Sequence, residues 1–370
     1  MGGWMNKKER FLTALLREIP DVVPVSPLIH DRFAYSVLRR TGWRAVFQVH
    51  QMVDSIYFRG PTGKGWFIDW PEGFSIKTFT KKENGRTIIE HWVRTTMGSL
   101  KQVDVVGFNP QDPVVYKTVE HFIKTERDYE AYKTYVEAWI NRAEPDFTEL
   151  KVAVKAIGNE GVAQDSIANA FSELVSVRGV KETYMDLYIR PKVVEDVLKI
   201  LWRKKEKEVE AFLESPSEVL YYDLWGVFEL SPKQFERFVL PELKMVTKLV
   251  REVDGKYVGF YMVGKGLRKQ LPMVVETEPH FIEPFELQSG VSIKEAKRMY
   301  GDKVCIMGNF NPVILAFGGL EDVENETIRC LEEGMEGGGY VLVTGDEVPA
   351  NAKLENLRTM VKTVEKYGKY

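Results

Sequence analysis

The segment GGGYVLVTGDEVPANAKLENLRTM, residues 337–360, joins a short apolar run to two adjacent acids and then to a helical pattern. The apolar run Tyr340–Val343 predicts a buried strand, because a strand covered on both faces reads as continuously apolar. Asp346 and Glu347 stand at the end of that strand, where burying an ionised carboxylate is costly unless something uses it. The segment therefore predicts a strand–loop–helix unit whose loop carries candidate functional acids.

The same alternation of strand and helix recurs through most of the chain. Strands that alternate with helices indicate parallel pairing, and seven or eight such units favour a closed barrel over an open sheet. We therefore predict an α/β fold of the (β/α)8 barrel type. The predicted strands are Val22–Leu28, Val152–Gly158, Val219–Trp225, Tyr257–Val263, His280–Phe285, Lys303–Phe310 and Tyr340–Gly345.

One region, at about residues 66–107, breaks this alternation with a pattern typical of antiparallel strands. It contains Asn84-Gly85 between β-rich runs, which is a strong hairpin signal. We predict an antiparallel β-hairpin insertion near the N-terminus, which either covers an active site or completes the core. The sequence shows no internal repeat or linker, so we predict a single domain over residues 1–370.

Composition excludes several classes of protein. The 370 residues include 51 Lys and Arg against 54 Asp and Glu, a net charge of −3, which predicts no nucleic-acid partner. No run approaches 18 apolar residues, so we expect no membrane span. The two cysteines, Cys305 and Cys330, exclude a disulfide framework and indicate a reducing, cytoplasmic location. These features exclude nucleic-acid-binding, membrane-spanning and disulfide-rich classes.

Polar residues follow most of the predicted strands, where the active sites of such barrels form. Some have structural alternatives, since acids near a helix start also act as caps and tyrosines often belong to the core. Motifs for phosphate binding or for a metalloprotease are absent. The candidate catalytic residues are His30, Asp223, Tyr261 and Asp346, and the candidate substrate-binding residues are Arg32, Asn159, Glu160, Glu283, Asn309 and Glu347.

Three stretches carry a family resemblance. The C-terminal third runs GNFNPV (308–313) and then GGGYVLVTGDEVPANAKLENL (337–357). It resembles the uroporphyrinogen decarboxylase superfamily, in which GN…P is followed by GGGYIL…G…P…ENL. KERFLTALLREIPDVVPV (8–25) is similar to that superfamily's opening helix and first strand, and LSPKQFERFVLPELKMV (230–246) is similar to its middle. The resemblance implies a (β/α)8 barrel with its active site at the carboxyl ends of the strands, and a homodimer.

The resemblance implies one of two chemistries. The decarboxylases carry an arginine-rich signature like MRQAGR after the first strand, and bidentate arginines suit a substrate with eight carboxylates. Here PLIHDRFAYSVLRRTGW (27–43) has arginines without that signature. The zinc methyltransferases carry His-x-Cys-Gly and a later Cys, and at these positions this chain has Tyr261, Val263 and Asp346. We therefore expect no thiolate zinc site. A different metal set would have to come from His30, Asp223, His280, Glu283, Asp346 and Glu347, of which His280 should lie at the far end of the barrel.

Three hypotheses remain open. The first is methyl transfer from a methylated or methoxylated small molecule to a corrinoid on a partner protein, with His30 or Tyr261 as the acid and with Asp346 and Glu347 positioning substrate or metal. The second is decarboxylation of a carboxylated ring compound, with Arg32 clamping a carboxylate and Asp223 or Asp346 stabilising a protonated intermediate. The third is a non-catalytic binding protein on a degenerate barrel. We prefer the first.

Overall fold

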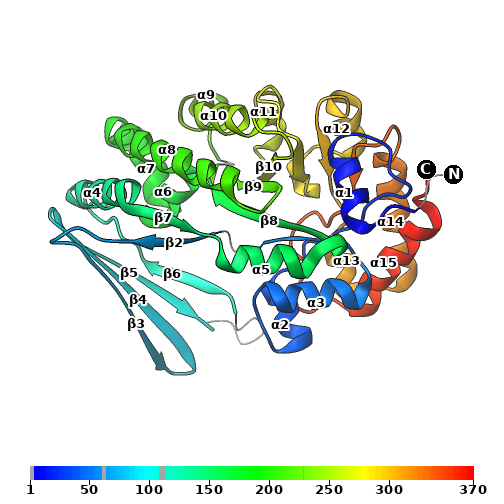
Figure 1. Ribbon diagram of the computed structural model, residues 1–370, viewed down its shortest axis with the longest axis horizontal. Helices are drawn as coiled ribbons and strands as arrows, with labels where there is room; N and C mark the ends of the chain where they lie inside the picture. Colours follow the sequence, from blue (N-terminus) through cyan, green and yellow to red (C-terminus); the bar gives the residue numbers. More distant parts are fainter. Residues whose placement is uncertain (1–3, 61–63, 108–113, 228) are drawn as a thin grey trace.

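The computed structural model describes residues 4–60, 64–107, 114–227 and 229–370 (Figure 1). Its centre is a parallel sheet of seven strands in the order β1-β8-β9-β10-β11-β12-β13. The order follows the chain, as expected when each strand is added beside the last. The strands are β1 (Tyr57–Arg59), β8 (Gly161–Ala168), β9 (Val219–Asp223), β10 (Tyr257–Met262), β11 (Phe281–Pro284), β12 (Cys305–Met307) and β13 (Tyr340–Val341).

Residues 22–28 take the eighth position and close the sheet without forming a regular strand. Val25 forms a parallel bridge with Leu342, beyond the end of β13. On the other side, the backbone N–H of Ile56, just before β1, donates to the carbonyl of Val25 at 2.9 Å. Pro24 and Pro27 have no N–H to donate, which limits this segment to isolated bridges. The predicted (β/α)8 barrel is confirmed in this form.

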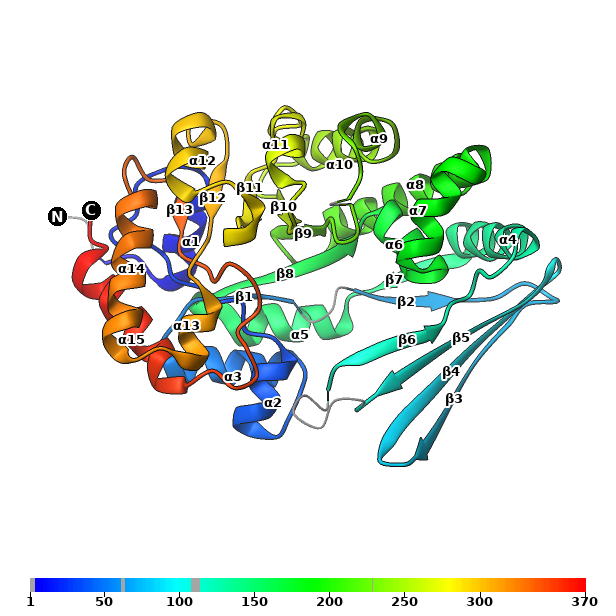
Figure 2. The ribbon, with the colours of Figure 1, turned by 180° about the vertical axis from the view of Figure 1, so that it is seen from behind.

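Helices surround the sheet on its outer side (Figures 1 and 2). In the described part of the chain, none of them is long and apolar enough to cross a membrane. The helices are α1 (Lys7–Leu15), α2 (Asp31–Leu38), α3 (Trp43–Val53), α4 (Glu126–Arg142), α5 (Thr148–Ile157), α6 (Ala170–Arg178), α7 (Val180–Ile189), α8 (Pro191–Glu214), α9 (Pro232–Phe238), α10 (Leu240–Arg251), α11 (Leu267–Val275), α12 (Ile293–Tyr300), α13 (Pro312–Phe317), α14 (Leu320–Gly334) and α15 (Leu354–Tyr367).

The barrel interior is filled by side chains rather than open. Phe58, Val219, Phe281 and Cys305 are buried there in one apolar cluster, which also includes Phe11 of α1. The helix α1 therefore packs against the amino-terminal end of the barrel, and the polar residues collect at the opposite end. This division separates a stabilising end from the end where chemistry is expected.

The predicted strand Val152–Gly158 is wrong, because most of it lies in helix α5. Leu150, Ala153 and Ile157 are the buried positions of α5, a spacing of three and four residues that is helical. The sequence analysis missed β1, which has only three residues, and β8, whose buried Gln164 and Asp165 interrupt its apolar pattern. The strands predicted near residues 219, 257, 280, 303 and 340 are confirmed.

The insertion is an antiparallel sheet that stands to one side of the barrel (Figure 2). Asn84 and Gly85 both have positive φ, 51° and 74°, at the turn between its first two strands, which confirms the predicted hairpin. The insertion lies between β1 and β8, and its strands extend past residue 107. They are β3 (Ser75–Glu83), β4 (Arg86–Thr95), β5 (Gly98–Val106) and β6 (Tyr116–Glu120), and a separate pair joins β2 (Gly65–Ile68) to β7 (Ala143–Asp146).

The barrel interior leaves no room at Gly259, which pairs with Phe281 between β10 and β11. A Cβ at Gly259 would overlap the ring carbons of Phe281. We predict that Gly259→Ala lowers the free energy of unfolding by about 1–3 kcal/mol, because the buried ring must move. Denaturant unfolding measures this change. Gly319→Ala, where the added Cβ meets only ordinary contacts, should cost less than about 1 kcal/mol; equal losses in both variants would refute the packing argument.

Candidate active site at the carboxyl ends of the barrel strands

A buried charge pair forms the centre of the candidate site. Arg59, the last residue of β1, places Nη1 3.6 Å from Oε1 of Glu283 in β11, and these side chains are 6% and 0% exposed. Burial raises the pKa of Glu283, and the positive charge of Arg59 opposes that rise. Within the described structure, Nε and Nη2 of Arg59 have no hydrogen-bond acceptor, and neither carboxylate oxygen of Glu283 has a hydrogen-bond donor. Buried polar atoms are normally satisfied, so this pair leaves donors and acceptors available to a ligand or to water.

Two tyrosines lie beside this pair. The guanidinium of Arg59 lies 5.8 Å from the ring centroid of Tyr221 in β9. The ring of Tyr221 lies 5.5 Å from that of Tyr261 in β10. The hydroxyl of Tyr261 donates to Oδ1 of Asp346 at 3.1 Å. Burial and then the charge of Asp346 raise the pKa of Tyr261, so its phenol stays protonated and acts as a hydrogen-bond donor.

Asp223 ends β9, in register with Tyr261 of the next strand. Its Oδ1 accepts a hydrogen bond from the backbone N–H of Trp225 at 2.8 Å. Burial raises the pKa of Asp223 to about 6, and that single backbone contact opposes the rise. A carboxyl group with this pKa populates both of its forms near neutral pH, which is a property of catalytic acids and bases.

His30, Arg32 and Glu347 meet at the rim. Nδ1 of His30 lies 3.6 Å from Oε1 of Glu347, and Nη1 of Arg32 lies 3.4 Å from Oε2 of the same carboxylate. The side chain of His30 is 41% exposed, yet the protein around its ring lowers its pKa by desolvation, and Arg59 lowers it further. An imidazole that is neutral at pH 7 is a weak proton donor. The directions of these two pKa shifts favour Asp223 over His30 as the acid.

Other predicted site residues lie elsewhere. Asn159 and Glu160 belong to a short 3-10 turn that follows α5 and precedes β8. Glu160 pairs with Lys7 of α1 at 2.9 Å, which places it at the amino-terminal end of the barrel. The error follows from reading α5 as a strand. His280 precedes β11 at that end as expected, and its Nδ1 accepts a hydrogen bond from the backbone of Val258.

Asn309 is buried and holds the loop after β12 to its surroundings. Its Nδ2 donates to the carbonyl of Phe285 at 2.8 Å, and its Oδ1 accepts from Nη2 of Arg329 in α14 at 3.0 Å. Both polar ends of the amide are thus occupied by protein. Asn309 has a structural role in these contacts, and the structure gives it no contact with Asp223 or Tyr261.

The side chains at the expected zinc positions do not fit a thiolate zinc. Tyr261 and Asp346 contact one another, and Val263 is a half-buried hydrocarbon just beyond β10. Both cysteines are buried, Cys305 in β12 and Cys330 in α14. In the described ranges, no group of three or more His, Cys, Asp or Glu side chains is placed to hold a metal ion. Function without the thiolate zinc remains a prediction.

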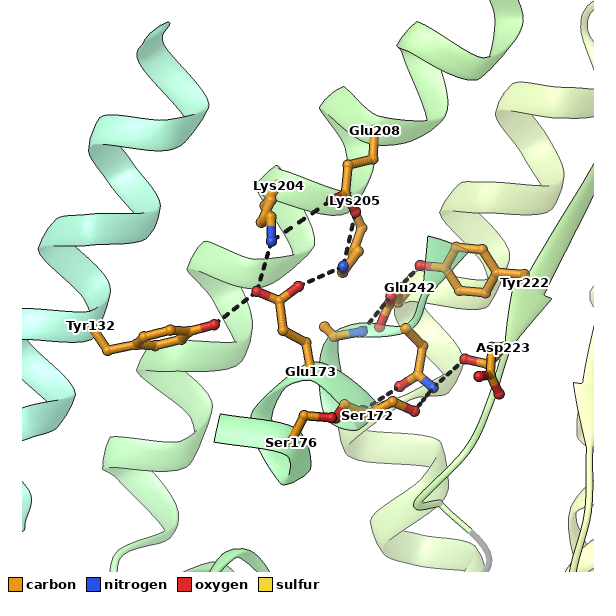
Figure 3. A network of polar contacts seen from close by, with 12 residues as sticks. Tyr132, Ser172, Glu173, Ser176, Lys204, Lys205, Glu208, Tyr222, Asp223 and Glu242 are labelled. Atoms are coloured by element: carbon orange, nitrogen blue, oxygen red, sulfur yellow. Dashed lines mark hydrogen bonds and ion pairs between the residues drawn. The ribbon is translucent and has the colours of Figure 1, made fainter. Parts of the chain in front are cut away.

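A polar network behind β9 fixes the backbone that carries Asp223 (Figure 3). Asn169, the N-cap of α6, donates to the carbonyl of Asp223 at 2.8 Å. Glu173 of the same helix accepts from Lys204 and Lys205 of α8 at 2.8 and 2.6 Å. Helix α6 is therefore tied to both its neighbouring helix and the strand end. Such support keeps a site residue in one orientation.

A cavity of about 760 Å³ lies between the antiparallel sheet and the barrel, and Asp223 is in its wall. This volume is within the range of small-molecule sites. The sheet side contributes Gln102, Asp104, Tyr116, Thr118 and the following His121, and the barrel side includes Ser172, Asp223 and Trp225.

The sequence analysis did not select Arg59, Tyr221 or Trp225. The short strand β1 hid Arg59, because no strand was expected to end there. Tyr221 could have been selected from the sequence, because it lies two residues before Asp223 in the same strand. Side chains two residues apart in a strand point to the same face of the sheet. Trp225 lies two residues after Asp223, the last residue of β9, and could have been selected from its closeness to that strand end.

Comparisons with known proteins agree with this architecture. The profile of the uroporphyrinogen decarboxylase (URO-D) family matches residues 118–367. The uroporphyrinogen decarboxylase of Pseudoalteromonas atlantica is 31% identical over 151 residues, 40% of this chain and 41% of that protein. That of Mannheimia succiniciproducens is 26% identical over 223 residues, 60% and 61% of the two chains. The matches thus span about half the length of these relatives.

A solved structure, a methyltransferase from Methanosarcina mazei, covers 98% of this chain and 99% of its own. Its TM-score is 0.66 and its sequence identity is 16%. At this identity the likeness establishes the shared fold. The structural alignment includes both the barrel and the insertion, because it leaves only a small fraction of either chain unaligned.

The raised pKa of Asp223 predicts a pH-dependent cost in stability. Its folded-state pKa of about 6 exceeds the ordinary 3.8, so the native state binds more protons between these values and stability falls as pH rises through them. We predict that Asp223→Asn is more stable than the parent chain at pH 7–8, by on the order of 1–3 kcal/mol, with the difference vanishing below about pH 3.5.

Denaturant unfolding at several pH values checks this prediction. Asp196→Asn is the matched control, because Asp196 is 44% exposed on α8 and removal of its charge should change stability by less than about 0.5 kcal/mol. A parent chain that is more stable than Asp223→Asn at pH 8 would mean that the ionised carboxylate is satisfied in the folded state.

Proposed function

The chain belongs to the uroporphyrinogen decarboxylase (URO-D) family, and from this premise we propose that it is an enzyme that transfers a methyl group from a methylated or methoxylated small molecule to a corrinoid on a partner protein. The charge balance at the barrel mouth carries the proposal. Arg32 and Arg59, the arginines at the mouth, each lie within 3.6 Å of a carboxylate. A substrate with eight carboxylates is bound best by arginines whose charge is not already balanced by a carboxylate of the protein. The mouth is therefore poorly suited to uroporphyrinogen.

Two further observations support methyl transfer. The structural neighbour that spans almost the whole chain is a methyltransferase by name. Tyr261 and Asp346, at positions where the resembled methyltransferases carry zinc ligands, meet at 3.1 Å across the mouth. This contact supports a reacting centre at the same place with different side chains.

In the proposed reaction the bond between the methyl carbon and its heteroatom breaks, and the electron pair stays on the heteroatom. A reduced corrinoid, when bound on its carrier protein, would supply the electron pair for the new bond to the methyl group, so that no other oxidant or reductant would be consumed. This chain orients the donor. Asp223 contacts the leaving group of the methyl donor. For a methoxylated donor it gives a proton to the leaving oxygen, and for a methylated ammonium donor it is a carboxylate beside the cationic nitrogen. The phenol of Tyr261, held by Asp346, donates a hydrogen bond.

The mouth is open to a docked partner. Asp346 is exposed and Trp225 is 40% exposed, so the groups around the reacting centre are accessible from outside. A corrinoid carried by another protein would have to approach along this side, because α1 packs on the other end of the barrel. The exposure of these residues is thus more consistent with a methyl acceptor carried by a partner protein than with a cofactor enclosed within this chain.

Decarboxylation of a carboxylated ring compound is the second candidate. The curated relatives are uroporphyrinogen decarboxylases by name. Nε and Nη2 of Arg59 are buried and lack a hydrogen-bond partner in the described structure, so they could hold one carboxylate. That is fewer contacts than a substrate with many carboxylates requires.

A spectroscopic assay separates the two reactions. The chain is mixed with free cob(I)alamin and, in turn, with methoxylated arenes, methylated amines and uroporphyrinogen. We predict a cobalt spectral change with a methylated donor that depends on the chain, and a rate loss of about 10²-fold or more in Asp223→Asn. Asp196→Asn should keep the parental rate. Carbon dioxide release from uroporphyrinogen without methyl transfer from any donor would reverse the assignment.

A further inference from the structure

The cavity between the antiparallel sheet and the barrel has an acidic character. Asp104 of β5 lies on one wall and Asp223 of β9 on the other, and the residues described as lining the cavity include no Lys or Arg. Asp104 is 8% exposed and accepts a hydrogen bond from Thr118 at 2.6 Å, and Nε2 of His91 lies 3.2 Å from its other oxygen. Oδ1 of Asp223 accepts a hydrogen bond from the backbone N–H of Trp225.

Nearby lysines do not neutralise these acids. Lys64 and Lys205 line a neighbouring pocket, and each is engaged with another carboxylate. Nζ of Lys64 lies 2.8 Å from Asp165, and Nζ of Lys205 lies 2.6 Å from Glu173. The cavity that contains Asp223 is therefore negative, and a bound anion would meet no compensating charge there.

Aromatic surfaces face the same cavity. Tyr116 of β6 is 65% exposed and Trp225 is 40% exposed, and they come from the sheet side and the barrel side. Nδ1 of His121 lies 2.9 Å from the carbonyl oxygen of Ser176, which can only accept, so Nδ1 donates this hydrogen bond. Exposed Trp and Tyr faces beside carboxylates are the usual means of binding quaternary ammonium groups.

We propose that this cavity binds a small organic cation of the methylated ammonium class, with the cationic group between Asp223 and the ring of Trp225. The inference rests on the proposed function, because it makes this cation the methyl donor. An uncharged arene would fill the cavity but leave the carboxylate of Asp223 without a counter-charge. A cation supplies that charge and contacts the aromatic walls.

The reaction balances with such a donor. The bond between the methyl carbon and the nitrogen breaks, and its electron pair stays on the nitrogen, which leaves as a neutral amine. The step therefore needs no proton donor. The reduced corrinoid of the proposed function supplies the electron pair that receives the methyl group. Asp223 acts in its ionised form, by holding the cation, rather than as an acid.

Isothermal titration calorimetry with two matched probes tests the site on the full chain without corrinoid. Choline carries a trimethylammonium group, and 3,3-dimethylbutan-1-ol has the same shape with carbon in place of nitrogen and no charge. We expect choline to bind at least about tenfold more tightly than the alcohol. Asp223→Asn and Trp225→Ala should each weaken choline at least about tenfold, Trp225→Phe should weaken it less, and Asp196→Asn should have no effect.

Equal affinities for choline and the alcohol, or no choline binding by the parent chain, would overturn the inference. The outcome is separable from that of the proposed function. Choline binding without methyl transfer to cob(I)alamin would support this site and refute the methyltransferase assignment. Transfer from a methoxylated arene together with an absence of choline binding would support the methyltransferase and refute the cation site.

Discussion

The buried pair of Arg59 and Glu283 is the constraint on which the rest of the site depends. Two ionisable groups inside an apolar barrel are stable only if their charges balance, and here one guanidinium lies beside one carboxylate at 3.6 Å. The tyrosines around the pair, Tyr221 and Tyr261, are held as neutral phenols by burial. Arg59 lies beside Glu283, and the described residues that line the outer cavity with Asp223 include no Lys or Arg.

The fold places these groups by ordinary means. Parallel strands deliver their carboxyl-terminal residues to one end of the barrel, while α1 packs against the other. The network of α6 and α8 fixes the backbone at Asp223, and the antiparallel insertion adds a second wall that the barrel alone would lack. Specificity would then come mainly from the insertion and the reacting centre mainly from the barrel, which is how one barrel serves different substrates.

Sequence patterns predicted the parts whose signals are local. The long apolar strands and the Asn84-Gly85 turn follow from period and turn chemistry. The resemblance placed Tyr261 and Asp346 at related positions, and the structure adds that their side chains are in contact. The failures have physical causes. Helix α5 carries an apolar run that reads as a strand, which misplaced Glu160, and β1 is too short to show a period, which hid Arg59. Asn309 follows strand β12, but only the tertiary contact with Arg329 shows that its amide is occupied.

The central claim is that the carboxylates and phenols of this mouth replace a thiolate zinc in methyl transfer. The most direct test is the rate of methyl transfer from choline to cob(I)alamin by the parent chain before and after treatment with a metal chelator. The account predicts equal rates, because Tyr261, Val263 and Asp346 present no thiolate. A rate that is lost on chelation and restored by one equivalent of zinc would contradict it.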